Sequence, residues 1–204
     1  KLIYTFTVNE TNITTFCMFL VDMFVRHPNF TMIPERRSSA IAIIDYLLIA
    51  LPARGIDPFT RIFNWVVSEC NDKRFEEAFK DLRTPMHKRD EAFYTKYKKH
   101  FGWATSGQGA TSRTELYSTT LMNALKKCHD RIYDPQVVSQ ILGLEIRNNR
   151  VDHASGKHDD FVIAMLLCHW FLSQSKNLNY YGINPLSVFK DNENTNIEDA
   201  NEYS

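Results

Sequence analysis

The apolar and polar positions in the first half of the chain predict strands and helices in alternation. Leu2–Val8 alternates and is rich in Ile, Tyr, Phe and Thr, which is typical of a strand. Phe16–Arg26 carries apolar residues at helical spacing, and a second helix is predicted over Ala40–Leu51. Between these helices, Phe30–Ile33 is a short apolar run typical of a buried strand. This β-α-β-α order favours a layered α/β domain with parallel strand pairing.

The second half predicts three further helices and one strand. Arg113–His129 and Pro135–Leu142 are expected to be helical, and Leu144–Arg147 to form a strand that ends in a turn. Val151–His158 is expected to be a polar loop. The helix predicted from Asp159 to Leu172 is almost entirely apolar, so we expect it to pack against the sheet and to be largely buried.

Two segments differ from the rest of the chain in charge. Residues 71–100 hold nine Lys or Arg and six Asp or Glu, and this mixture favours a solvated helix face over a dedicated DNA surface. Residues 190–204 hold one Lys and five acidic residues and are rich in Asn. We therefore predict one folded domain over residues 1–189, followed by an acidic disordered tail.

The composition narrows the class of protein. The 204 residues are 44% apolar and carry 24 Lys or Arg against 24 Asp or Glu, which excludes a uniformly basic nucleic-acid coat but leaves room for a local basic groove. No apolar run approaches the roughly 18 residues of a membrane span. The four cysteines are widely spaced and form no CxxC pair, so we expect reduced, mostly buried thiols in a cytoplasmic protein.

One loop weakly resembles a phosphate-binding loop. Gly102 and Gly107 have the spacing of such a loop, but Gln108 and Gly109 stand where the Lys and Ser/Thr are needed to contact phosphate and magnesium. A flexible surface loop, or a loop that contacts a DNA backbone, is the better interpretation.

An acidic residue follows the predicted strand at Phe30–Ile33. Glu35 lies between that strand and the next helix, at the kind of strand end where α/β proteins build their sites, and Arg36 and Arg37 come directly after it. The simpler alternative is a carboxylate that caps the helix and pairs with its neighbours, and the residues alone leave both open.

A second acidic group surrounds the start of the last apolar helix. Asp159 and Asp160 open this helix, where the helix dipole favours carboxylates, so one of them is explained as a cap. Asp152, His153 and His158 add a third carboxylate and two imidazoles nearby. Clustered acids of this kind suit Mg²⁺ or Mn²⁺. The two histidines are expected to support the metal ligands or to face DNA.

The chain resembles the nuclease domain of tailed-bacteriophage terminase large subunits. Three segments carry the resemblance: IPERRSSAIAIIDYLL at Ile33–Leu48, FGWATSGQGATSR at Phe101–Arg113, and NNRVDHASGKHDDFVIAMLLCHWFL at Asn148–Leu172. The resemblance implies an α/β, RNase H-like fold, with a mixed central sheet flanked by helices. It also implies a DNA endonuclease that uses two divalent ions and cuts concatemeric DNA during genome packaging.

The resemblance assigns roles to individual acids. Glu35 matches the family's second acidic motif, and Asp159 and Asp160 match the third; Asp160 is the first choice as direct metal ligand, with Asp159 left open. The basic residues that flank these acids are candidate DNA contacts, namely Arg36, Arg37, Arg113 and Lys157. Implied partners are double-stranded DNA, the terminase ATPase domain, the small terminase subunit and the portal, in the cytoplasm of an infected bacterium.

The family's first acidic motif has no match in this chain. No Asp occurs within Lys1–Asn9, so the first strands and their Asp are expected on another segment, as is the ATPase motor. A domain without that Asp is expected to bind metal poorly and to cut weakly. Two alternatives stay open: a non-catalytic DNA-binding or docking module of the packaging motor, and a resolvase or transposase of the same superfamily.

Overall fold

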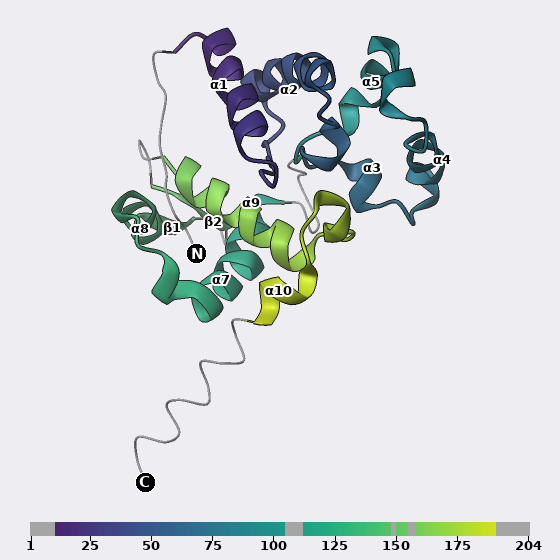
Figure 1. The fold of residues 1–204 in the computed structure, drawn as a ribbon. Coiled ribbons are helices and arrows are strands. Elements are labelled where there is room, and N and C mark those ends of the chain that lie inside the picture. Colours follow the sequence, from purple (N-terminus) through teal and green to yellow (C-terminus); the bar gives the residue numbers. More distant parts are fainter. Residues whose placement is uncertain (1–10, 105–111, 148–149, 155–157, 191–204) are drawn as a thin grey trace. The chain divides into compact units, whose positions relative to one another are not determined.

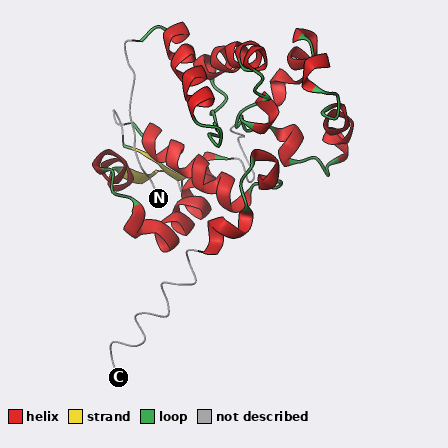
Figure 2. Cartoon of the chain, viewed as in Figure 1, coloured by secondary structure: helices red, strands yellow, loops and turns green. Residues whose placement is uncertain are grey.

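The computed structural model describes residues 11–104, 112–147, 150–154 and 158–190. Most of these residues are helical, and the strands among them form one two-stranded antiparallel sheet (Figure 2). The residues form two compact units. Unit 1 comprises the described residues of 112–174 together with 184–190, and unit 2 comprises 11–104 together with 175–183.

Figure 1 labels the main elements along the chain. Those of unit 2 are α1 (Ile13–Arg26), α2 (Ser38–Ala50), α3 (Trp65–Ser68), α4 (Lys73–Asp81) and α5 (Glu91–Tyr97), with short 3-10 turns η1 (Pro52–Arg54), η2 (Pro58–Thr60), η3 (Met86–Lys88), η4 (Lys98–His100) and η7 (Leu178–Tyr181). Those of unit 1 are α6 (Arg113–Glu115), the π-helical turn η5 (Leu116–Thr120), α7 (Leu121–Cys128), η6 (His129–Arg131), α8 (Pro135–Leu142), β1 (Leu144–Arg147), β2 (Arg150–His153), α9 (Asp160–Gln174) and α10 (Pro185–Lys190).

The predicted helices are all present, with ends shifted by at most a few residues, and α8 and β1 have the predicted bounds. The prediction of a polar loop from Val151 is wrong, because β2 covers its first three residues and pairs with β1 in antiparallel register. The strand expected at Leu2–Val8 and the tail from residue 191 lie outside the described residues. The prediction of a single domain over residues 1–189 stays a prediction.

Three extended segments lie side by side in unit 2. Met32 forms a parallel bridge with Ile62, and Glu35 forms a parallel bridge with Trp103. The backbone N–H of Phe63 donates to the carbonyl of Met32 at 2.9 Å, which continues the first of these pairings. The strand predicted at Phe30–Ile33 is therefore present as extended, bridged backbone rather than as a continuous strand. This pairing fixes the backbone at Glu35 beside a buried segment.

Gly102 has a structural role in this arrangement. Its φ of +82° belongs to the left-handed region, and an added Cβ would lie 3.1 Å from the carbonyl oxygen of Pro34 and 3.2 Å from Ile44. Both neighbours lie in the core of unit 2, so only glycine fits. Gly107, the other glycine of the weak phosphate-loop match, lies outside the described residues.

The core of unit 2 is built from aromatic rings around one buried cation. The Phe59 ring is fully buried, and its centroid lies 4.7 Å from that of Phe101. The Arg89 side chain, only 4% exposed, forms an ion pair with Asp57 at 2.9 Å and lies over the rings of Phe59 and Phe93. Arg89 therefore connects η2 to the segment around α5.

The stability of the protein should fall in mildly acidic solution because of His100. Burial lowers the pKa of this imidazole, and the charges of Lys99 and Arg36 lower it further. In the unfolded chain its pKa is about 6.5, so below that pH the unfolded state binds more protons and stability is lost as pH falls through this value. In urea melts at about pH 7.5 and pH 5.5, His100→Phe should reduce the loss of stability on acidification. An equal loss in the wild type and in His100→Phe would contradict this assignment.

In unit 1, α9 has one buried face and one exposed face, although its sequence is apolar on nearly all sides. Val162 and Leu166 are fully buried, and Ile163, Leu167 and Phe171 are nearly so, which confirms a buried face. The helix packs against α7, α8 and η5. Its opposite side includes the exposed residues Ala164 and Cys168. The buried face thus makes most of its contacts with helices, whereas the sequence predicted packing against a sheet.

The cysteines are free, as expected, but their burial differs from the prediction. Cys17 is buried in α1, Cys70 and Cys128 are half-buried, and Cys168 is exposed, so the expectation of mostly buried thiols is wrong. Among the described residues, no helix combines the length and apolar character that a membrane crossing requires.

Candidate metal centre

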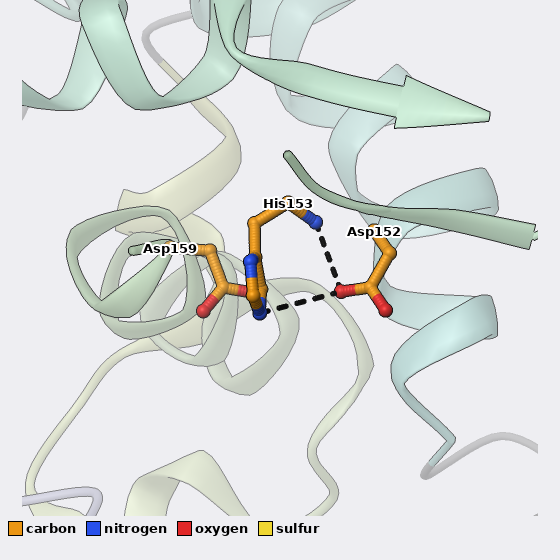
Figure 3. Close-up of side chains that lie close together, drawn as sticks. All are labelled: Asp152, His153 and Asp159. Atoms are coloured by element: carbon orange, nitrogen blue, oxygen red, sulfur yellow. Dashed lines mark hydrogen bonds and ion pairs between the residues drawn. The ribbon is translucent and has the colours of Figure 1, made fainter. Parts of the chain in front are cut away.

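Two carboxylates and one imidazole converge in unit 1. Asp152 and His153 end β2, and Asp159 directly precedes α9; one ligand atom from each lies within 4.8 Å of the others. Figure 3 shows the His153 ring drawn between the two carboxylates. The His153 Nε2 atom lies 3.8 Å from Asp152 Oδ1. Since each ligand atom lies about 2.0–2.2 Å from a bound transition metal, these spacings suit neighbouring ligands of one ion.

Asp159 is the buried member of this group. Its side chain is 6% exposed, and it accepts a hydrogen bond from the Tyr117 hydroxyl. The Arg113 guanidinium approaches both carboxylate oxygens, with Nη1 3.3 Å from Oδ2 and Nη2 3.4 Å from Oδ1. The Tyr117 hydrogen bond thus orients this carboxylate, and Arg113 places a positive charge beside it.

A π-helical turn brings Tyr117 to this position. The helix that begins at Arg113 widens to π geometry over Leu116–Thr120 before it continues as α7. This turn contacts both α9 and β2, and single π turns inside α-helices are frequent at functional sites. Burial raises the pKa of the Tyr117 hydroxyl, and its hydrogen bond to Asp159 raises it further, so the hydroxyl keeps its proton and acts as a donor.

Neither aspartate caps α9 with its side chain among the contacts described. The backbone N–H groups of Phe161 and Val162 donate to Gln140 Oε1 at 3.0 and 3.2 Å. Gln140, from α8, therefore supplies the cap that the sequence analysis assigned to one aspartate. The Asp159 carboxylate is left to face Tyr117, Arg113 and the end of β2.

The His153 ring is oriented as in many metal-binding histidines. Its Nδ1 atom lies 3.0 Å from the carbonyl oxygen of Ala154. A carbonyl oxygen only accepts, so Nδ1 carries the proton in this contact, and in the neutral ring Nε2 keeps its lone pair. Metal-ligating histidines commonly donate their other N–H group to a carbonyl in this way. His153 is therefore suited to be a direct ligand, where the sequence suggested a supporting role.

Asp160 and His158 lie in a different environment. Their side chains are 81% and 84% exposed, and their nearest charged atoms are 3.8 Å apart. Asp159 and Asp160 therefore differ sharply in burial although they are adjacent in sequence. This geometry favours Asp159, the second choice of the sequence analysis, as the carboxylate that binds metal.

The other predicted site residues lie partly elsewhere. Glu35 belongs to unit 2, where it forms an ion pair with Arg37 at 2.9 Å, so its expected proximity to Asp159 and Asp160 stays a prediction. Arg36 donates to the carbonyls of Lys98, Lys99 and Phe101, which gives it a structural role at the end of η4.

Of the four predicted DNA contacts, Arg36, Arg37 and Arg113 are each engaged with groups of the protein itself. Lys157 lies outside the described residues. The three described arginines of the predicted basic rim therefore already have partners within the protein. Their contacts with DNA stay predictions.

The sequence analysis missed Tyr117 and Gln140. Both lie far from the acids in sequence: Tyr117 precedes Asp159 by 42 positions, and Gln140 precedes Phe161 by 21. A polar residue on an otherwise apolar helix face is the one signal that could have marked them. Asp152 was noted as a third carboxylate but was not assigned as a ligand.

The donor set fits a divalent cation. Carboxylates suit Mg²⁺ and Mn²⁺, and an added imidazole favours a transition metal such as Mn²⁺ over Mg²⁺. Asp152 is exposed and Asp159 buried, so a cation here would be anchored on one side and open to water on the other. Comparisons with protein-family models, with curated proteins and with solved structures found no match to this chain.

Proposed function

We propose that this protein is a metal-dependent DNA endonuclease whose cation site includes Asp152, His153 and Asp159. The observation that carries the proposal is the convergence of these three side chains within 4.8 Å, at the end of a strand and the start of a buried helix. Enzymes that hydrolyse phosphodiesters commonly use divalent cations held by carboxylates.

The residues around the cluster have distinct tasks in this proposal. Tyr117 holds the Asp159 carboxylate in one orientation, and its own proton stays in place because its pKa is raised by burial. The contact between His153 Nδ1 and Ala154 directs Nε2 toward the carboxylates. Asp152, at the exposed side, leaves room for a phosphate of the substrate. A bound divalent cation would supply Lewis-acid stabilisation of the charge that develops on that phosphate.

The resemblance to terminase nuclease domains extends the proposal to a biological role. It suggests an RNase H-like fold, cutting of concatemeric DNA during packaging, and work beside a packaging ATPase, a small terminase subunit and a portal. The parallel bridges at Met32 and Glu35 are compatible with the parallel pairing of an α/β domain, and the RNase H-like fold itself is proposed on the resemblance alone. Glu35 and a second metal ion are proposed on the resemblance alone.

The direct test is plasmid nicking by the full chain. We expect slow conversion of supercoiled to nicked plasmid with Mn²⁺, weaker conversion with Mg²⁺, and none with EDTA. Conversion that is equal with and without EDTA would contradict a metal-dependent mechanism. Plasmid binding in a gel-shift assay without nicking in any metal would favour the alternative of a non-catalytic DNA-binding module.

A further inference from the structure

We propose that Arg113 is an exchangeable counter-ion: it neutralises Asp159 in the metal-free protein and moves to a DNA phosphate when a divalent cation binds. This inference rests on the proposed function, since it needs a cation at Asp159. Metal binding would then raise the affinity for DNA, and DNA binding would raise the affinity for metal, through this one side chain.

Asp159 needs a positively charged partner when no metal is bound. Its carboxylate is 6% exposed, and burying an unpaired charge is costly. Tyr117 donates one hydrogen bond but brings no charge. Among the described residues, Arg113 is the cation that forms an ion pair with Asp159. Arg113 is thus the positive charge that balances the Asp159 carboxylate when no metal is bound.

The ion pair between Arg113 and Asp159 is loose. Its two N···O distances are 3.3 and 3.4 Å, whereas charge-assisted hydrogen bonds between such groups are usually about 2.7–2.9 Å. The buried Nε atom of Arg113 has no hydrogen-bond partner among the described residues. Its side chain is also 27% exposed, so the guanidinium has a path to solvent. A partner held this weakly is readily displaced.

Arg113 and a divalent cation would compete for the Asp159 carboxylate. Arg113 approaches both oxygens of Asp159, so a cation that binds either oxygen directly also meets the guanidinium charge. Like charges at such close range repel, and the divalent ion has the stronger attraction to the carboxylate. The displaced guanidinium is a planar fork that matches phosphate oxygens, and the proposed substrate places a phosphate beside the same cluster.

The consequence is a measurable coupling between the two ligands. If Arg113 leaves Asp159 on metal binding, metal raises the affinity for DNA, and DNA raises the affinity for metal by the same factor. Removing the arginine should then have opposite effects on the two ligands: metal should bind more tightly because its competitor is gone, and DNA should lose one phosphate contact.

The experiment compares Arg113→Gln with Lys126→Gln, which removes one exposed charge from α7 in the same unit. Mn²⁺ binding is measured by electron paramagnetic resonance, and DNA binding with a short phosphorothioate duplex, with Mn²⁺ or EDTA, over a range of salt concentrations. We expect Arg113→Gln to bind Mn²⁺ about fivefold more tightly or better. We also expect it to lose the gain in DNA affinity that Mn²⁺ gives the wild type, with a salt slope smaller by about 1. Lys126→Gln should retain the wild-type Mn²⁺ affinity and the Mn²⁺-dependent gain.

Either of two outcomes with Arg113→Gln and the wild type would overturn the inference. Unchanged or weaker Mn²⁺ binding by Arg113→Gln would make Arg113 a residue that merely orients Asp159. A wild type that binds DNA equally with Mn²⁺ and EDTA would exclude the exchange. If Arg113→Gln does not fold, Arg113→Lys serves instead, because lysine keeps the positive charge but lacks the planar, forked guanidinium. Arg113→Lys should bind Mn²⁺ like the wild type and lose part of the gain in DNA affinity that Mn²⁺ gives. An undiminished gain in DNA affinity would overturn the inference. If the wild type binds no Mn²⁺ at all, the proposed function itself fails, which is a distinguishable result.

Discussion

Asp159→Asn should abolish Mn²⁺-dependent nicking, with a loss of about 10²-fold or more, while the protein stays folded. Asparagine has nearly the shape of aspartate, and with its carbonyl oxygen in the place of Oδ2 it still accepts the hydrogen bond from Tyr117. What it lacks is the negative charge that attracts a divalent cation into the buried side of the cluster. Plasmid nicking with Mn²⁺, beside a thermal melt of each protein, measures both effects.

Asp160→Asn is the matched control for this prediction. The two residues are adjacent and chemically identical, but the Asp160 side chain is 81% exposed and its nearest charged partner is His158 at 3.8 Å. This variant should therefore retain most of the nicking activity. Loss of nicking in Asp160→Asn together with wild-type nicking in Asp159→Asn would move the centre to the exposed carboxylate.

Arg89→Met should destabilise unit 2 by about 3–5 kcal/mol, because it breaks a buried ion pair by removing one partner. The guanidinium donates to Asp57 and to the backbone carbonyls of Leu82 and Thr84, and it lies over two aromatic rings. Methionine fills part of the space but leaves Asp57 without this cation and both carbonyls without this donor. The free energy of unfolding is measured by urea denaturation.

Arg83→Met is the control for that experiment, since Arg83 is an exposed arginine in the same part of unit 2. It should leave the urea midpoint nearly unchanged. If Arg83→Met and Arg89→Met were equally stable, the buried cation would contribute little to the fold, and the aromatic packing around Phe59 would be sufficient to hold unit 2 together.

The helices were predictable because their apolar residues recur at helical spacing, as in α1 and α8. Strand β2 was not, because its sequence RVDH is polar except for Val151, and its place is decided by pairing with β1. Short strands of this kind are specified by a partner rather than by their own pattern. The polar sequence of β2 also explains why a loop was expected from Val151.

The site was predictable only as a region. Clustered acids before an apolar helix indicate a cation site, but two adjacent aspartates look alike in a sequence. Which one is buried depends on how α9 lies against η5 and α8, and this in turn depends on contacts between residues far apart in the chain, such as Tyr117 with Asp159. The cap from Gln140 is another such contact, and it overturned the simplest explanation for one aspartate.

The central claim is that Asp152, His153 and Asp159 together hold a divalent cation. A Mn²⁺ titration of the 204-residue chain, followed by electron paramagnetic resonance, tests it most directly. We predict saturable binding of at least one ion by the wild type and by Asp160→Asn, and loss of that ion in Asp159→Asn. Absence of saturable binding in the wild type, or equal binding by Asp159→Asn, would contradict it.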